Sequence, residues 1–352
     1  GTPPPDSSVE QFVPGYETNR EALGNVSTEA ARRREATWVT GARPQRLPET
    51  RDLAGWLRGT SGKGRHDTGD RCCSIWSGSA EARNRRLLQE PQIVSARFAT
   101  RLLGWKDSPK NNGIPKNRLG WAYVPNCADV DSAESMRLAA GMLDSLEVER
   151  DTLSDVPQNP GGPLEQLVAE DLAISLPSLA PKRRWNVRRG QVISSFAQYE
   201  HLNEIDRLVD ANPELRITIG KDYLIRPDVT IGLEDLSILG ERPFLHAAIS
   251  CKWTIRSDRV QNIRHEFNQM IRHRRGRQPH LVTVTAEPLP SRLASIARGT
   301  GEVDAVYHIA LEALGAAVDA DGNDEQVAAW NECIGQKRLL SYGDMVATLA
   351  AW

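Results

Sequence analysis

A nearly continuous apolar run over residues 243–255, PFLHAAISCKWTI, restricts the possible fold more than any other stretch of the sequence. A strand with one face in water alternates apolar and polar residues, whereas this run leaves no polar face. Continuous apolar strands are typical of the centre of a sheet that is covered on both faces. The run therefore predicts a central strand in an α/β domain. The charged Lys252 near its end, followed by the cluster RSDR at 256–259, requires a chemical explanation.

Helical and strand patterns alternate around this run. Apolar residues recur at helical spacing in the segments 132–146, 163–176, 199–215, 258–273 and 290–297. Strand patterns occupy the segments 185–194, 226–233, 280–287 and 303–310. We expect the helix over 199–215 to stop near Asn212 and Pro213, because proline cannot continue a helix. The alternation predicts an α/β fold with a central mixed β-sheet flanked by helices.

The first 90 residues differ from the remainder of the chain. They are rich in Gly, Pro, Arg, Ser and Thr, as in TGARPQRLPE, and they contain few periodic apolar runs. We interpret residues 1–90 as an N-terminal extension that is partly disordered, and residues 91–352 as one folded domain.

The cysteine pattern and the hydropathy restrict the location of the protein. Five cysteines show neither a CxxC pair nor the spacing of a zinc module, which indicates a reducing cytoplasm. The chain has no run of about 18 apolar residues and no signal-peptide pattern, so we expect no membrane partner.

Positive charge is concentrated in one stretch, although the net charge is −2. Between residues 256 and 277 there are seven arginines and only two acidic residues. This stretch is either a basic surface for a polyanion or a solvated helix face, and the sequence alone leaves both readings open.

Asp228 and Lys252 form the candidate catalytic pair. They lie 24 residues apart, at the ends of two predicted strands, and an antiparallel pairing would bring them to the same end of the sheet. A carboxylate that binds Mg²⁺ beside a lysine suits phosphodiester hydrolysis. Surface ion pairs give the same pattern, however. The position two residues before the lysine, where nucleases of this kind usually carry an acid, is Ser250. Glu266 and Glu165 are the candidates for a second carboxylate, and each could instead be an exposed helix residue.

Four long motifs carry a resemblance to a known family. They are NPELRITIGKDYLIRPDVTI, LHAAISCKWTIRSDRVQNIRHE, RRGRQPHLVTVTAEPLPSRLASIARGTGEVDAVYHIAL and GQKRL. The segment from about Gln158 to Leu314 resembles the NgoMIV family of type II restriction endonucleases, in the CCGG-recognising branch of the PD-(D/E)XK nuclease superfamily. The likeness extends weakly upstream through SAESMRLAAGMLDSL, covers about two thirds of the chain and leaves out the first 90 residues.

The resemblance implies a restriction-endonuclease-like core and a catalytic set. This set consists of Asp228, Lys252, Glu266, Glu165 and Ser250, with Glu266 as the displaced carboxylate that compensates for Ser250. Asp228, Glu266 and the backbone carbonyl of Cys251 would be metal contacts. Two Mg²⁺ ions per active site would then flank the scissile phosphate.

The same resemblance assigns the residues that read DNA. Arg256 and Arg259 would donate to guanine, and Asp258 would accept from cytosine, which suits a CCGG core. Arg292 would read the outer base pair in the major groove and Gln158 would contact it from the minor groove. The expected target is GCCGGC in double-stranded DNA.

A palindromic target implies a two-fold symmetric protein, so we expect at least a dimer. The resemblance implies a homotetramer. It also implies a cytosine methyltransferase that acts on the same site without forming a stable complex, and a protein associated with the nucleoid in the bacterial cytoplasm. Two other classes compete with this reading: a repair nuclease with loose sequence preference, and a DNA-binding module without catalysis.

Overall fold

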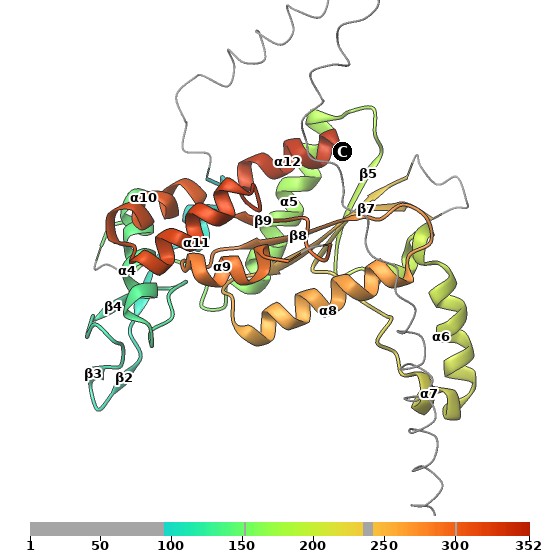
Figure 1. Cartoon of the computed structure of the whole chain (residues 1–352), viewed down its shortest axis with the longest axis horizontal. Helices are drawn as coiled ribbons and strands as arrows, with labels where there is room; N and C mark the ends of the chain where they lie inside the picture. The colour runs from blue at the N-terminus through green and yellow to red at the C-terminus, as the bar shows by residue number, and fades with distance from the viewer. Residues whose placement is uncertain (1–94, 151–152, 235–241, 300) are drawn as a thin grey trace, which may run out of the picture. The chain divides into compact units, whose positions relative to one another are not determined.

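The computed structural model describes residues 95–150, 153–234, 242–299 and 301–352 (Figure 1). The predicted extension over residues 1–90, and its boundary with the following domain, lie outside these residues.

Six strands form one mixed sheet in the order β10-β9-β8-β7-β6-β5. Their bounds are β5 (Trp185–Arg189), β6 (Val229–Leu233), β7 (Phe244–Lys252), β8 (His280–Thr285), β9 (Ala305–His308) and β10 (Leu339–Ser341). The apolar run forms β7, which pairs antiparallel with β6 and parallel with β8. Every residue of β7 is buried except the two at its ends. The prediction of a central strand covered on both faces is confirmed.

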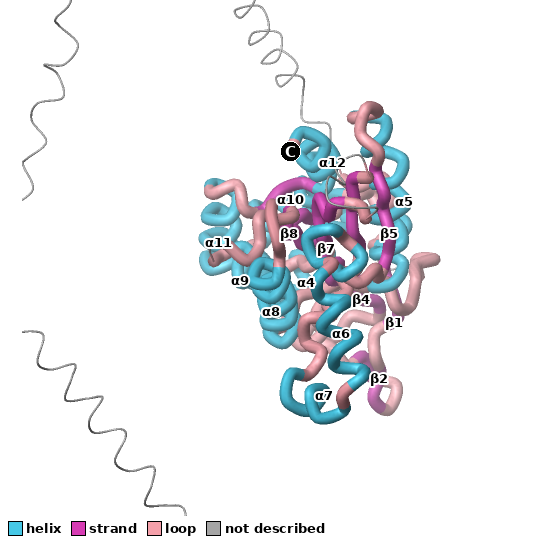
Figure 2. Tube along the Cα trace, turned by 90° about the vertical axis from the view of Figure 1, so that its right-hand side faces the viewer, coloured by secondary structure: helices cyan, strands magenta, loops and turns pink. Residues whose placement is uncertain are grey.

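Helices cover both faces of the sheet, as Figure 2 shows. On one side lies α5 (Gly161–Leu179), against which α12 (Tyr342–Ala351) packs. On the other side lie α8 (Ser257–His273), α9 (Pro290–Ala297) and α11 (Asp324–Gly335). The predicted α/β architecture, with a mixed sheet flanked by helices, is confirmed.

Two further helices, α4 (Ala133–Ser145) and α10 (Leu311–Asp321), pack closely on each other. A Cβ atom added to Gly141 of α4 would lie 2.9 Å from the Cβ atom of Ala317. The missing side chain is therefore what lets the two helix backbones approach. The Ser132 side chain begins α4 by accepting a hydrogen bond from the Ser135 N–H.

Two small structures project from the body on the same side (Figure 1). One is the helix pair α6 (His201–Ala211) and α7 (Pro213–Ile219). The other follows the short helix α3 (Ala99–Leu102) and consists of β1 (Trp105–Asp107), β2 (Lys110–Asn111), β3 (Ile114–Pro115) and β4 (Tyr123–Pro125). The turn between β2 and β3 uses Asn112 and Gly113 at φ values of 51° and 80°, as expected for an Asn-Gly hairpin.

Three predicted elements end differently in the structure. The strand predicted over 185–194 ends at Arg189, because Gly190 adopts a φ of 58° and a 3-10 turn follows at Ile193–Ser195. The strand predicted over 280–287 ends at Thr285. The helix that begins at His201 ends at Ala211, as expected, but Pro213 starts a second helix. Within the described ranges, no helix is both long and apolar enough to span a membrane.

Candidate functional site

The antiparallel pairing of β6 and β7 brings Asp228 and Lys252 together. Val229 pairs with Ile249, so Asp228, just before β6, lies beside the last residues of β7. The Lys252 ammonium donates to Oδ2 of Asp228 at 2.7 Å, and their side chains are 25% and 22% exposed. A freely solvated surface ion pair would be more exposed. The pair is thus held in a partly buried position at one end of the sheet.

The backbone of β7 fixes the Asp228 carboxylate. Oδ2 also accepts the Cys251 N–H at 2.7 Å and the Ser250 hydroxyl at 3.4 Å. None of these bonds uses Oδ1. Ser250 is buried, and its hydroxyl donates to Asp228. It occupies the position where nucleases of this kind usually carry an acid. One carboxylate oxygen is anchored and the other is available to a cation.

Glu266, on α8, faces the same pair. Burial raises the pKa of its carboxyl, the Lys252 charge lowers it, and the Asp228 charge raises it. These influences indicate that Glu266 lies close to both residues. Asp228 contacts Lys252 directly, and Glu266 adds a second carboxylate within electrostatic range of both.

A Mg²⁺ ion fits this donor set. In the part of the chain that the structure describes, no three His, Cys, Asp or Glu side chains form a ready-made metal cage. Mg²⁺ does not require one, because it keeps several waters and is often bound by one or two carboxylates. Asp228 and Glu266 match that number.

Glu165, on α5, is not in direct contact with the pair. Its carboxylate accepts a hydrogen bond from Arg189 at 3.0 Å, and the same guanidinium nitrogen reaches the Gly162 carbonyl at 3.4 Å. Burial raises the pKa of the Cys251 thiol, and the charges of Asp228 and Glu165 raise it further. Glu165 is therefore near this end of β7, although its nearest partner is an arginine.

The three charged residues of the RSDR cluster differ in their availability. Arg256 and Asp258 are exposed at the start of α8, where the acidic side chain is favoured by the helix dipole. Arg259 is folded back, since its Nη1 donates to the Thr254 carbonyl at 2.6 Å and to the Thr254 hydroxyl at 3.0 Å.

An open groove of about 790 Å³ brings Arg256 and Arg292 together. Its walls are the N-terminal half of α8, the start of α9, the loop before α4 and the start of α11, which adds the carboxylate of Glu325. Arg292 donates to Asp129 at 2.5 Å in this groove. Burial works to raise the pKa of Asp129, but the hydrogen bond and charge of Arg292, with the charge of Arg256, hold it below its ordinary value. Sequence reasoning missed Asp129, because its loop resembles ordinary helix-capping sequence.

Gln158 lies apart from that groove. It is exposed and lines a smaller cavity of about 310 Å³, together with Lys106, Asn126 and Ser154. The structure therefore does not join Gln158 to Arg292.

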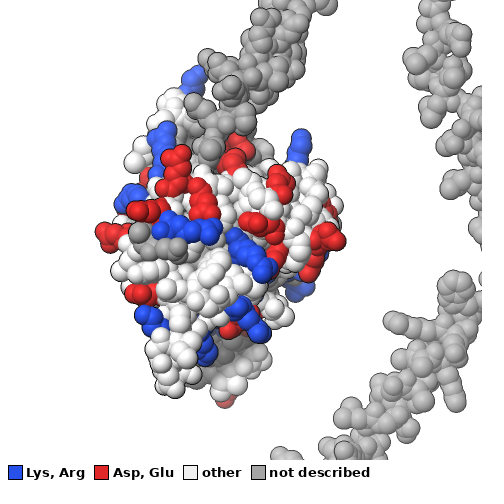
Figure 3. Space-filling view, turned by 90° about the vertical axis from the view of Figure 1, so that its left-hand side faces the viewer, with Lys and Arg blue, Asp and Glu red and all other residues white. Residues whose placement is uncertain are grey.

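The predicted basic stretch of α8 is only partly available to a ligand. Arg264 donates to the Ser295 and Arg298 carbonyls and so ties α8 to α9. Arg277 reaches the Trp352 carbonyl at 3.3 Å. The face that includes α4 and α10 carries acidic and basic side chains side by side (Figure 3).

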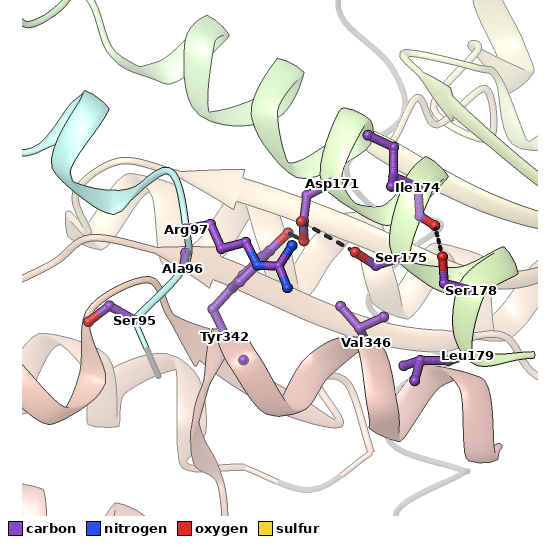
Figure 4. A pocket seen from close by; sticks show the side chains of 11 residues that line it. Ser95, Ala96, Arg97, Asp171, Ile174, Ser175, Ser178, Leu179, Tyr342 and Val346 are labelled. Carbon is purple, nitrogen blue, oxygen red and sulfur yellow. Dashed lines mark hydrogen bonds between the residues drawn. The ribbon is translucent and has the colours of Figure 1, made fainter. Parts of the chain in front are cut away.

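A third cavity, of about 350 Å³, lies between α5 and α12. Figure 4 shows Asp171 between Tyr342 and Ser175 on its wall. The Tyr342 hydroxyl donates to Asp171 at 3.0 Å, and Ser175 donates to the other carboxylate oxygen at 3.4 Å. The lining of this cavity includes none of the predicted site residues, so it is not the candidate catalytic site.

Comparisons with known proteins agree with this geometry. The family model described as NgoMIV restriction enzyme matches residues 114–238 and 237–351. The type II restriction enzyme NgoMIV of Neisseria gonorrhoeae is 36% identical over an alignment of 257 residues that covers 64% of this chain and 90% of that protein. The matched residues include the candidate catalytic pair and both sides of the groove. The chain belongs to the NgoMIV restriction enzyme family.

Proposed function

We propose that this type II restriction endonuclease cuts both strands of double-stranded DNA at a palindromic site with a CCGG core, in a reaction that requires Mg²⁺. The observation that carries the proposal is the placement of the Asp228–Lys252 pair four residues from Arg256. In this proposal the hydrolytic pair and the base-reading arginine therefore lie at the same end of β7. This arrangement suits an enzyme that cleaves DNA within the sequence that it recognises.

The catalytic residues of the chain have distinct tasks. Ser250 and the Cys251 N–H hold Asp228, and Asp228 holds the Lys252 ammonium at 2.7 Å. Lys252 orients the attacking water and offsets the charge that develops on the phosphate. Burial raises the pKa of Glu266, so its carboxyl takes up a proton more readily than an ordinary glutamate.

Oxygen donors of Asp228, Glu266 and the Cys251 carbonyl would hold Mg²⁺, with two ions per site in this proposal and Glu165 as an outer acidic residue. When bound, Mg²⁺ neutralises charge on the phosphate and lowers the pKa of a coordinated water.

Base reading is assigned to Arg256 and Arg292, which line the groove, and to Asp258 and Arg259, which follow Arg256 in the chain. Arg256 and Arg259 each present donors that match guanine O6 and N7, and Asp258 accepts from cytosine amino groups. Arg259 must leave Thr254 to do so. Arg292, beside Asp129, repeats this arrangement of an arginine next to a carboxylate. It would read the outer pair, which gives the site GCCGGC.

Gln158 is proposed to contact the same outer pair from the minor groove. A palindromic site requires two symmetric copies of the chain, so the active species is a dimer or, as the family resemblance suggested, a tetramer. A methyltransferase for the same site would act independently, without a stable complex. The proposed place of action is bacterial DNA in the cytoplasm.

A plasmid digest tests the proposal. Plasmids with no, one or two GCCGGC sites would be incubated with the protein and Mg²⁺, and the ends of the products would be sequenced. Discrete cuts at GCCGGC that are absent with Lys252→Ala are the expected result. Cuts at unrelated sequences would refute the base-reading assignment and favour a nuclease of loose preference. Specific binding without cutting would favour a non-catalytic DNA-binding protein.

A further inference from the structure

We infer that Glu287 is a positioning residue that holds the two base-reading loops of the groove in a fixed relation to each other, so that one buried carboxylate sets the accuracy of reading at both the inner and the outer base pairs. The inference rests on the proposed function, because it assigns the loops the task of reading DNA.

The two loops leave neighbouring strands. Lys252, at the end of β7, pairs with Thr285, at the end of β8. The Ala286 N–H donates to the Trp253 carbonyl at 3.2 Å, so the loops remain side by side after the strands end. The first loop leads to Arg256 and the second leads to Arg292.

Glu287 connects these loops through both of its carboxylate oxygens. Oε2 accepts the Ile255 N–H at 2.7 Å, and Ile255 directly precedes Arg256. Oε1 accepts the Leu289 N–H at 3.1 Å, and Leu289 is the residue on which α9 begins, three positions before Arg292. The Glu287 side chain is 1% exposed, so water does not compete for these bonds. A shift of either loop breaks a bond to the shared carboxylate.

Glu287 also sets the direction of a reading side chain. Arg292 places Nη1 at 3.9 Å from Oε1 of Glu287 and Nη2 next to Asp129. The guanidinium is thus held between two carboxylates that come from different segments of the chain. A guanidinium with a fixed orientation loses less conformational freedom when it binds a guanine edge.

The surroundings of Glu287 argue against a role in the hydrolytic site. Burial raises its pKa to about 7, the Ile255 N–H and the Arg292 charge lower it, and the Asp129 charge raises it. These partners all belong to the groove, and Lys252 is not among them. Burial of a carboxylate carries a large desolvation penalty, and an apolar side chain of the same volume often stabilises a fold as well. Its distinctive property is that it accepts two N–H groups and one guanidinium in a defined geometry.

The test compares two conservative variants of the full-length protein. Glu287→Gln keeps the shape but places an amide NH₂ opposite one of the two N–H donors. Asp304→Asn is the control, because Asp304 is a partly buried carboxylate that likewise accepts a backbone N–H, from Leu281 at 2.8 Å, at the opposite end of β8. Cleavage rates and binding affinities are measured on a GCCGGC duplex and on duplexes changed at the outer or the inner pair. Thermal unfolding of both variants is recorded alongside.

Glu287→Gln is expected to lower discrimination at both the outer and the inner pair by about tenfold, with a raised KM and a nearly unchanged kcat on GCCGGC. Asp304→Asn should leave discrimination unchanged, even at equal loss of thermal stability. Unchanged discrimination in Glu287→Gln, or an equal loss in both variants, would overturn the inference. If Glu287→Gln does not fold, Glu287→Asp, which keeps the charge but is one methylene shorter, is measured against the same criteria.

The failure of the proposed function would be seen separately. A wild-type protein that binds GCCGGC specifically without cutting it still allows the inference to be tested by affinities. A wild-type protein with no preference for any of the duplexes refutes both.

Discussion

Replacement of Lys252 by methionine is the sharpest test of the catalytic pair, because it removes one charge and nearly preserves the volume. The lost bond joins two charged groups at 2.7 Å, but the side chains are 22–25% exposed. A charged hydrogen bond contributes about 1.5–3 kcal/mol, and solvent screening reduces this to about 1 kcal/mol here. Asp228 keeps its bond from the Cys251 N–H. We therefore expect the melting temperature to fall by only about 2–4 °C.

The expected loss of activity is much larger. A group that stabilises charge developing in the transition state contributes about 2.7–4 kcal/mol, so the single-turnover cleavage rate should fall by about 100- to 1,000-fold. The affinity for GCCGGC should change by less than about tenfold, since one phosphate contact is a small part of a groove interaction.

The assay is single-turnover cleavage of a labelled duplex, with binding measured separately in the absence of cleavage. Lys221→Met is the matched control, because Lys221 is a similarly exposed lysine bound to carboxylates, at 2.9 Å to Asp206 and 2.6 Å to Asp210, outside the site. A rate for Lys252→Met within tenfold of wild type would refute the catalytic assignment. So would an equal loss of rate in the control variant.

Three further predictions concern recognition and pH. Arg256→Ala should weaken discrimination at one inner guanine by about 1–3 kcal/mol, measured as the ratio of cleavage rates on matched and substituted duplexes. Burial raises the pKa of Glu266, so its carboxyl takes up a proton at a higher pH than an ordinary glutamate. The rate should therefore fall earlier on the acidic side than for an ordinary carboxyl, and Glu266→Gln should remove this limb together with most of the activity. Burial lowers to about 4 the pKa of three histidines, namely His246, His280 and His308. The unfolded chain binds these protons first, so stability should fall between pH 6.5 and 4, by about 1.4 kcal/mol per pH unit for each histidine, with Glu287 acting in the opposite sense. The free energy of unfolding, measured with urea at each pH across this range, should depend less steeply on pH in His280→Gln.

The sequence predicted those parts of the fold that depend on local pattern. The apolar run gave the central strand, because burial on both faces leaves a signature in consecutive residues. The Asp228–Lys252 contact was also predictable, since a spacing of 24 residues between two strand ends limits how they can pair.

Contacts between distant segments were not predictable. Asp129 and Arg292 lie 163 residues apart and meet only because α4 and α9 are brought to the same groove. The sequence predicts a strand over 280–287 that ends at Glu287, but β8 ends at Thr285. The Thr285 hydroxyl then accepts the Glu287 N–H at 3.1 Å. The sequence around a single carboxylate in a turn does not indicate which two N–H groups will donate to it. The tertiary fold supplies both.

The short link between Lys252 and Arg256 explains why cutting and reading are expected to be coupled. Trp253 and Ile255 are buried, and the Trp253 indole N–H donates to the Asn126 carbonyl at 3.2 Å. The Ile255 N–H is held by Glu287. The link is thus fixed at two points, and only a few backbone dihedrals separate the proposed base-reading Arg256 from the proposed catalytic Lys252. A wrong base that displaces Arg256 would therefore also displace the lysine from the phosphate. Because a misplacement of about 1 Å can cost a factor of about 100 in rate, such a link makes cleavage more selective than binding.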